Sequence, residues 1–326
     1  MNIDLNTKIV RYGELIPCKT AFIDAHTPGS DQKENFTIIG GGVAESPDQH
    51  VHLNDTPGFN IGAAGQPPGC TNSLHFHHTA EVFFILKGRW RFFWGRRGDA
   101  GEVVLDEGDI INIPTHIFRG FENVGTDYGM IMAVLGGNDA GGGVVWAPEV
   151  LDTANKHGLV LDETGKLYDT KKGEQLPEGV KPMQSLSETE LTAIGEPPVQ
   201  AIVRDHVARY WDMMALSRTA PCDVIGEQAL LQDLPGFDID FLSRDSISAE
   251  QYCVDSNEII MIMRGHWRLE WSGGHTVLNP GDTCAVPPGQ LHSLSPAVSG
   301  EASLFRVRNT HDLAGATKTQ LLKETS

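Results

Sequence analysis

The chain has 326 residues, of which 40% are hydrophobic and 21% charged, and this composition is typical of packed globular domains. Its 25 Lys and Arg against 43 Asp and Glu give a formal net charge of −18. An acidic surface of this kind repels nucleic-acid phosphates and anionic lipid headgroups. We therefore expect neither nucleic acid nor membrane among the partners.

The first 19 residues contain no apolar run that could serve as the core of a signal peptide. No stretch of the sequence approaches the roughly 20 apolar residues of a membrane span. The five cysteines are scattered, odd in number and without a CxxC pair. These features predict a reduced, cytoplasmic protein, and a homo-oligomer is compatible with them.

The first half of the chain has the pattern of antiparallel β-structure. Short runs rich in β-branched and aromatic residues, separated by Gly, Asp and Pro, occur at residues 81–86, 89–94, 102–105 and 110–114. Residues 95–101 read as a hairpin loop. Many short strands with turn residues between them predict a sandwich or a barrel.

A segment of different character follows, and we place this linker at residues 146–200. Residues 147–158 are expected to form a short helix, because Pro148 suits a first turn and Gly158 suits a C-terminal cap. Ser187 and Glu190 have the spacing of a capping box, which predicts a second short helix.

The second half of the chain repeats the first. The segment from Phe83, FFILKGRWRFFWGRRGDAGEVVLDEGDIINIP, returns from Ile259 as IIMIMRGHWRLEWSGGHTVLNPGDTCAVP. Landmarks recur in the same order and at nearly constant separation: Phe59 with Phe237, Glu81 with Glu258, and Gly108 with Gly281. We infer a duplicated domain, with copies at residues 1–145 and 201–326.

One group of residues in the first copy has metal-ligand character. His75 and His77 are one residue apart, so on a strand both imidazoles point to the same face, whereas His78 points to the opposite one. Glu81 follows across a turn and supplies a carboxylate. Two imidazoles and a carboxylate suit Fe(II), and also Mn, Ni or Zn.

The spacing around these residues resembles the first motif of the cupin superfamily, Gly, five residues, His, one, His, three, Glu, six, Gly. The residues that carry the resemblance are Gly69, His75, His77, Glu81 and Gly88. The resemblance implies an all-β chain of two cupin barrels, each a double-stranded β-helix or jelly roll, joined by the short, partly helical linker. It also implies one divalent transition metal per chain, with Fe(II) as the expected ion.

The second cupin motif is kept in outline, through Gly108, Pro114 and Asn123, but it departs at two places. His116 stands at the turn glycine and either swings inward as a fourth metal ligand or merely occupies the turn. Arg119 stands where the family usually has a histidine ligand. A guanidinium cannot coordinate a cation, so we predict that Arg119 enters the cavity and anchors an anionic substrate. The alternative is an internal salt bridge to a glutamate, Glu81 or Glu122.

The second copy keeps only part of the ligand set. Glu258 and His292 remain, but Tyr252 and Val254 stand at the two histidine positions of the first motif. Two ligands rarely hold a metal alone, so we expect this barrel to be metal-free.

The chain resembles bicupin dioxygenases that act on gentisate-like hydroxyaromatic acids or on flavonols, including quercetin. The resemblance implies an Fe(II)-dependent dioxygenase of a small anionic hydroxyaromatic or enolic compound. Two alternatives stay open. One is a metal-dependent isomerase or lyase, and the other is a non-catalytic cupin that binds a small molecule.

Overall fold

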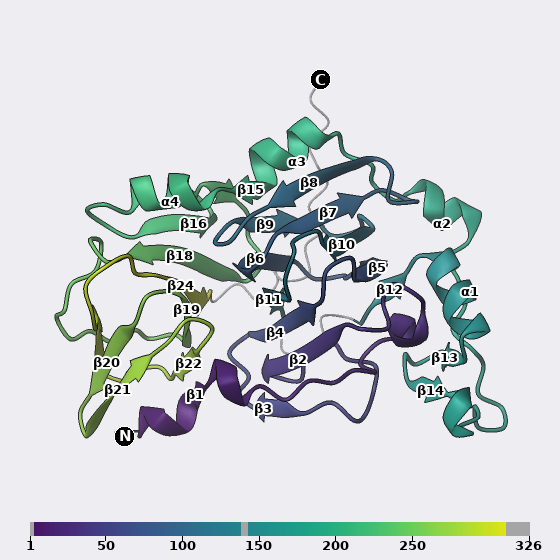
Figure 1. Cartoon of the computed structure of the whole chain (residues 1–326), viewed down its shortest axis with the longest axis horizontal. Coiled ribbons are helices and arrows are strands. Elements are labelled where there is room, and N and C mark those ends of the chain that lie inside the picture. Colours follow the sequence, from purple (N-terminus) through teal and green to yellow (C-terminus); the bar gives the residue numbers. More distant parts are fainter. Residues whose placement is uncertain (1–2, 138–142, 311–326) are drawn as a thin grey trace.

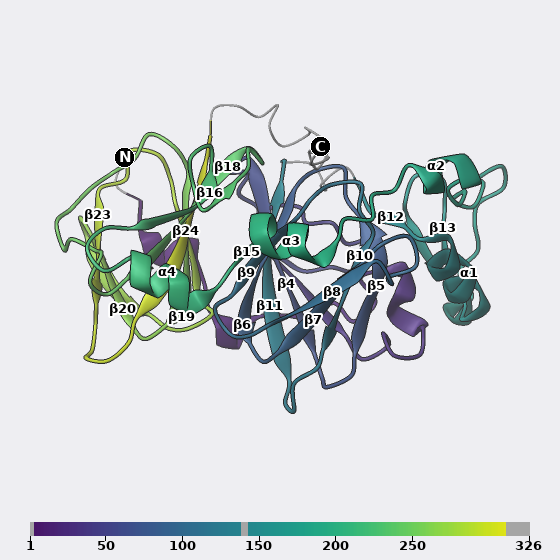
Figure 2. The ribbon, with the colours of Figure 1, turned by 90° about the horizontal axis from the view of Figure 1, so that it is seen from above.

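The computed structural model describes residues 3–137 and 143–310. The predicted fold class is confirmed, because the described chain forms two cupin-type β-barrels side by side, with short helices between and beside them (Figures 1 and 2). The last residues of the predicted second domain, 311–326, lie outside the described part.

Two sheets build the first barrel within the described residues. One has the order β15 (Val207–Ala208), β9 (Ile110–Ile113), β6 (Glu81–Lys87), β11 (Gly129–Gly136), β4 (Phe59–Gln66), β2 (Glu34–Ile39), β3 (Val51–Leu53). The other has the order β12 (Val145–Trp146), β5 (Thr71–Phe76), β10 (Arg119–Asn123), β7 (Trp90–Trp94), β8 (Gly101–Leu105). Apolar side chains from both sheets form one buried cluster of this barrel, among them Phe83 of β6 and Trp90, Phe92 and Trp94 of β7.

The second barrel repeats this plan with a smaller second sheet. Its large sheet has the order β1 (Ile9–Val10), β22 (Thr283–Val286), β19 (Glu258–Arg264), β24 (Ser303–Asn309), β18 (Phe237–Ser243), β16 (Cys222–Gly226), β17 (Leu231–Gln232). The small sheet has the order β21 (Gly274–Leu278), β20 (Trp267–Trp271), β23 (His292–Pro296).

The two large sheets pack against each other and bury the main apolar cluster between the barrels. Aromatic rings meet across this interface: Phe84 lies 4.8 Å from Phe305 and Phe59 lies 5.5 Å from Phe237, measured between ring centroids. The duplicated landmarks Phe59 and Phe237 therefore contact each other directly, and the repeat seen in the sequence brings the two copies together.

The barrels also exchange short arms. β1, which precedes the first barrel, pairs with β22 of the second, with Ile9 opposite Cys284. β15, which precedes the second barrel, pairs with β9 of the first, with Val207 opposite Ile111. The predicted domains 1–145 and 201–326 each include one arm that pairs with the opposite barrel. Domain boundaries drawn from the sequence do not show this exchange, because it depends on the contact between the two large sheets.

The segment between the barrels contains the helices. They are α1 (Pro148–Lys156), α2 (Glu188–Thr192), α3 (Val199–His206) and α4 (Tyr210–Leu216), with the hairpin β13 (Leu159–Leu161) and β14 (Leu167–Asp169) after α1. Short 3-10 turns stand at η1 (Leu5–Lys8), η2 (Tyr12–Glu14), η3 (Ile23–His26) and η4 (Thr170–Lys172). Pro148 begins α1, and Ser187 and Glu190 form the capping box of α2. No helix of the described residues is both long and apolar enough to cross a lipid bilayer.

Candidate metal centre

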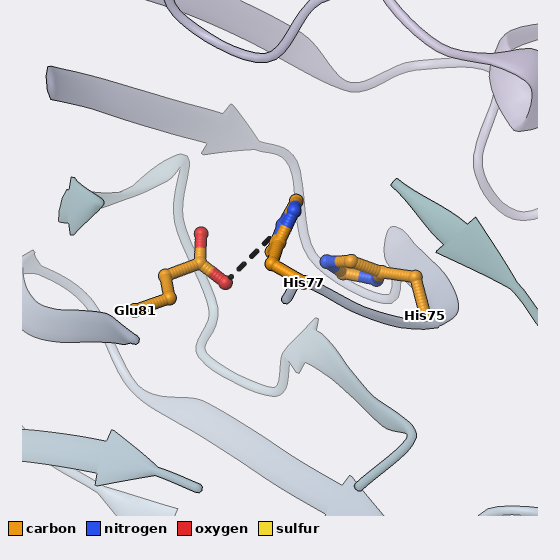
Figure 3. A group of neighbouring side chains, drawn as sticks. All are labelled: His75, His77 and Glu81. Carbon is orange, nitrogen blue, oxygen red and sulfur yellow. Dashed lines mark ion pairs between the residues drawn. The ribbon is translucent and has the colours of Figure 1, made fainter. Parts of the chain in front are cut away.

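Three potential ligands converge inside the first barrel. His75 lies near the end of β5, His77 follows this strand directly, and Glu81 is the first residue of β6. All three are buried, and their ligand atoms lie within 4.8 Å of one another (Figure 3). As expected for residues one apart on a strand, His75 and His77 point to the same, buried side, whereas the neighbouring His78 is exposed on the opposite face.

Hydrogen bonds set which nitrogen of each imidazole faces the cluster. His75 Nδ1 lies 2.7 Å from the Ser73 carbonyl oxygen, and His77 Nδ1 lies 2.9 Å from that of Gly143. A carbonyl only accepts, so each Nδ1 carries the hydrogen and leaves the lone pair on Nε2. This is the tautomer that a metal-binding histidine needs.

The surroundings keep both imidazoles neutral. Burial, and next the positive charge of Arg119, lower the pKa of His75 well below its ordinary value. Burial lowers the pKa of His77 to about 4, although the Glu81 carboxylate acts in the opposite direction. Neutral imidazoles at ordinary pH are competent ligands.

The three residues therefore fit a divalent transition metal. His77 Nε2 lies 3.6 Å from Glu81 Oε2, close enough for one ion to bridge them with little movement. The donor set of two nitrogens and one carboxylate oxygen suits such ions, with coordination positions left over for a ligand.

Arg119 is fully buried and lies in the wall beside this cluster. Its guanidinium donates to Glu81 Oε2 and makes a longer contact, 3.4 Å, with the carbonyl oxygen of His75. It is not among the residues that line the cavity. The salt bridge to Glu81, the alternative drawn from the sequence, is thus the arrangement observed, and direct anchoring of an anion by Arg119 stays a prediction.

His116 lies outside the three-ligand cluster. Its backbone has φ of 58°, the one positive value among the described non-glycine residues, which explains why cupins usually have glycine here. Its ring packs 5.2 Å from Phe76 and 5.5 Å from His78, on the outer face of β5. In this arrangement His116 occupies the turn, and its role as a fourth ligand is not supported.

A cavity opens beside the cluster, with an empty volume of about 700 Å³ including its mouth. Most of its lining is apolar or aromatic, including Phe22, Phe36, Val43, Ala64, Phe83, Phe121, Ile131, Leu135, Val144 and Trp146. Polar groups are few, and they include Asn35, Thr37, Asn60 and Asn72 with the three ligands.

The equivalent place in the second barrel is filled by protein groups. Glu258 Oε1 accepts from the Tyr252 hydroxyl at 2.8 Å and lies 3.0 Å from His292 Nε2, while Oε2 accepts from Arg308 at 2.7 Å. The other nitrogen of His292 faces the Gln290 carbonyl at 2.9 Å. Both imidazole nitrogens therefore face acceptors, and no metal-ligand group of three or more is found here among the described residues.

Comparison with family models finds one matching domain in each barrel. Residues 65–135 match the model of the cupin domain, and residues 247–317 match that of the AraC-like ligand binding domain. The chain is built of two cupin barrels. Comparison of the sequence with curated proteins gave no significant match.

Several solved bicupin structures share this architecture. Oxalate decarboxylase from Bacillus subtilis superimposes with a TM-score of 0.55 at 11% identity, over 93% of this chain and 76% of that one. A formate complex of the Lactobacillus farciminis enzyme gives 0.54 at 11%, over 93% and 86%. Procruciferin, an 11S globulin of Brassica napus, gives 0.53 at 12%, over 86% and 80%. At these identities the likeness shows the fold alone, since decarboxylases and an 11S globulin share it.

Proposed function

We propose that this chain is a metal-dependent oxidoreductase, an Fe(II) dioxygenase that acts on a small anionic hydroxyaromatic or enolic compound. The observation that carries the proposal is the convergence of His75, His77 and Glu81 on one side of a largely apolar cavity. A bound metal of this kind supplies reactivity toward O₂ and a Lewis acid for substrate oxygens. The chain's own residues supply the pocket and its charge.

The charge balance of the site favours an anion. The two imidazoles are neutral, and the guanidinium of Arg119 offsets the carboxylate of Glu81. The ligand set as a whole therefore offsets little of the charge of a divalent cation. Because the cavity is mostly apolar, an uncompensated positive charge there attracts an anionic ligand strongly.

The lining also offers a specific polar contact. The side-chain oxygen of Asn35 is buried and has no hydrogen-bond partner among the described residues, and Asn35 lines the cavity. A buried acceptor without a partner costs about 1–3 kcal/mol, which a ligand hydroxyl would recover once rotation of the Asn35 side chain turns this oxygen toward the cavity. Aromatic walls at Phe22, Phe83 and Trp146 suit a planar ligand. Together these groups support an aromatic or enolic compound that bears hydroxyl groups.

A second candidate is a metal-dependent isomerase or lyase, in which the metal acts only as a Lewis acid. The observation in its favour is the same charge balance, because a ligand set with little net charge leaves the cation strongly electrophilic. The fold likeness to oxalate decarboxylases, one of them in complex with formate, is compatible with a small carboxylate at such a site.

One experiment separates the two candidates. The protein is loaded with Fe(II) under anaerobic conditions and screened against hydroxyaromatic acids and flavonols, with O₂ consumption and product formation both recorded. Dioxygenase activity requires stoichiometric O₂ uptake that His77→Ala abolishes. Product formed without O₂ would support the isomerase or lyase instead, and ligand binding without turnover would refute both.

A further inference from the structure

A buried ion pair lies behind His75. Asp24 in η3 and Lys33, just before β2, are 0% and 1% exposed, and the Lys33 ammonium donates to Asp24 Oδ1. Lys33 is the one lysine that is buried among the described residues. Its ammonium also lies 5.2 Å from the ring centre of Phe22 and 5.9 Å from that of Trp146.

Both charged groups bind consecutive residues of β5. Lys33 Nζ donates to the side-chain oxygen of Asn72 at 2.9 Å, and Asp24 Oδ2 accepts from the backbone N–H of Ser73 at 3.1 Å. The pair thus connects the N-terminal segment to the strand that carries the metal ligands.

The strand is irregular at this point. In the pairing with β10, His75 is opposite Arg119 and Asn72 is opposite Phe121. Between these two pairs β5 therefore contains one residue more than β10. Such a bulge bends a strand and re-aims its side chains. The Ser73 N–H that lies in the bulge is the group that Asp24 accepts.

The bulge also contains the group that orients His75. The Ser73 carbonyl accepts from His75 Nδ1 and so directs Nε2 toward the cluster. We propose that Asp24 and Lys33 are positioning residues, which hold the bulge of β5 and thereby aim His75 at the metal. This inference rests on the metal centre proposed above.

The second barrel supports the inference by contrast. The backbone of Tyr252, at the position of His75, forms an isolated bridge with His292 and belongs to no strand, and the described residues 246–251 before it form no strand either. Among its described residues, the second barrel thus has neither a buried lysine nor an anchored strand at this place.

The ion pair is not explained by stability alone. Replacing a buried pair by apolar side chains is often neutral or stabilising when nothing else depends on it. Here apolar replacements would leave the part-buried Ser73 N–H and the buried Asn72 side-chain oxygen without these partners. We therefore infer that the ion pair serves to hold residues 72 and 73 in their observed conformation.

The test measures the affinity of the full-length, metal-free protein for Co²⁺, by competition with a chromophoric chelator. Lys33→Met and Asp24→Asn should lower the affinity by about tenfold to a hundredfold, the usual effect of residues that orient metal ligands. Asp24→Glu keeps both charges and moves the carboxylate by one methylene, so it should fold and still bind Co²⁺ more weakly. The conservative Lys33→Arg should recover part of the affinity.

Asp240→Asn is the matched control, because Asp240 pairs with Arg306 inside the second barrel. It should lower thermal stability while leaving Co²⁺ affinity unchanged. Nitrogen-15 NMR of the metal-free protein adds a structural readout, since His75 should carry its hydrogen on Nδ1 in the wild type and lose this preference in Lys33→Met.

Folded Lys33→Met, Asp24→Asn and Asp24→Glu proteins that bind Co²⁺ as tightly as the wild type would overturn the inference. A wild-type protein that binds no Co²⁺, Fe(II) or Zn²⁺ would instead reject the metal centre itself, so the two failures are distinguishable.

Discussion

Arg119 donates to the carboxylate of Glu81 in the first barrel, and His292, at the equivalent position of the second, contacts Glu258 in the same way. In both barrels, therefore, the glutamate of the first cupin motif contacts the residue at the position where the second motif usually has a histidine ligand. That residue is Arg119 in the first barrel and His292 in the second. In the first barrel, His75 and His77 remain directed at the cavity.

Replacing Arg119 by Leu should lower the free energy of unfolding but leave metal binding intact. The metal should remain, since its three ligands are untouched, but Glu81 loses its counter-charge. Breaking a buried ion pair costs about 3–5 kcal/mol, so the free energy of unfolding of the metal-free protein should fall by that order. Urea unfolding with and without Zn²⁺ measures both effects, and Zn²⁺ should recover much of the loss.

Arg91→Leu is the control, because Arg91 forms half-exposed ion pairs with Glu102 and Glu122 and should cost about 1 kcal/mol or less. Loss of the metal from Arg119→Leu would show that the salt bridge holds Glu81 in place. If Arg119 anchors the substrate directly, as predicted from the sequence, Arg119→Leu would instead lose about a hundredfold in anion affinity.

His116→Gly should keep the metal and leave the unfolding free energy within about 1 kcal/mol of the wild type. Glycine relieves the positive φ, which offsets the lost ring contacts with Phe76 and His78 and the added chain entropy. Metal analysis together with thermal unfolding checks this. Disappearance of the metal would identify His116 as a fourth ligand after all.

Glu45 should make the protein less stable as the pH rises. Burial raises the pKa of its carboxyl from 4.5 to about 8, although hydrogen bonds from Trp146 and from the Ile23 N–H oppose this. The folded state therefore holds a proton that the unfolded state releases near pH 4.5, so this contribution to stability falls from about pH 4.5 to 8.

Glu45→Gln, a neutral side chain of the same shape, should flatten that part of the stability profile. Melting temperatures of both proteins at pH 5, 6.5 and 8 provide the comparison. Equal pH dependence in the two proteins would exclude a raised pKa at Glu45.

Glu258 should act in the opposite direction. Its burial is outweighed by the hydrogen bond with His292 and by Arg308 and Arg306, so its pKa is lowered to about 2. The stabilising effect is present above the unfolded pKa near 4.5 and is lost as the pH falls toward 2. Glu258→Gln should be destabilised at pH 7, with a smaller difference from the wild type at pH 3, and its metal content should be unchanged. A drop in metal content would place a site in the second barrel.

The barrels and the ligand trio could be predicted from the sequence because both rest on local patterns. Alternating residues place His75 and His77 on one face, and the repeated Gly, Trp and Asp landmarks show the duplication. The partner of Arg119 could be narrowed only to Glu81 or Glu122, because the choice depends on how β10, β5 and β6 pack.

Two features lay beyond such patterns. Asp24 and Lys33 occur in a polar stretch that resembles any solvated loop, and only the fold brings them to β5. The exchanged arms do leave a trace in the sequence, since Arg11-Tyr12 recurs as Arg209-Tyr210. Each arginine pairs with an equivalent aspartate of the opposite barrel, Asp282 or Asp109. A repeat of two residues is too short to be recognised as a structural signal from the sequence alone.

The most direct test of the account is the metal content of the purified protein after reconstitution with Fe(II), Co²⁺ or Zn²⁺ and removal of the excess. The wild type and Tyr252→Ala should each hold one equivalent per chain. His75→Ala and His77→Ala should hold almost none, because two remaining ligands rarely retain an ion. One equivalent retained by the His75→Ala/His77→Ala double variant would contradict the assignment of the centre to the first barrel.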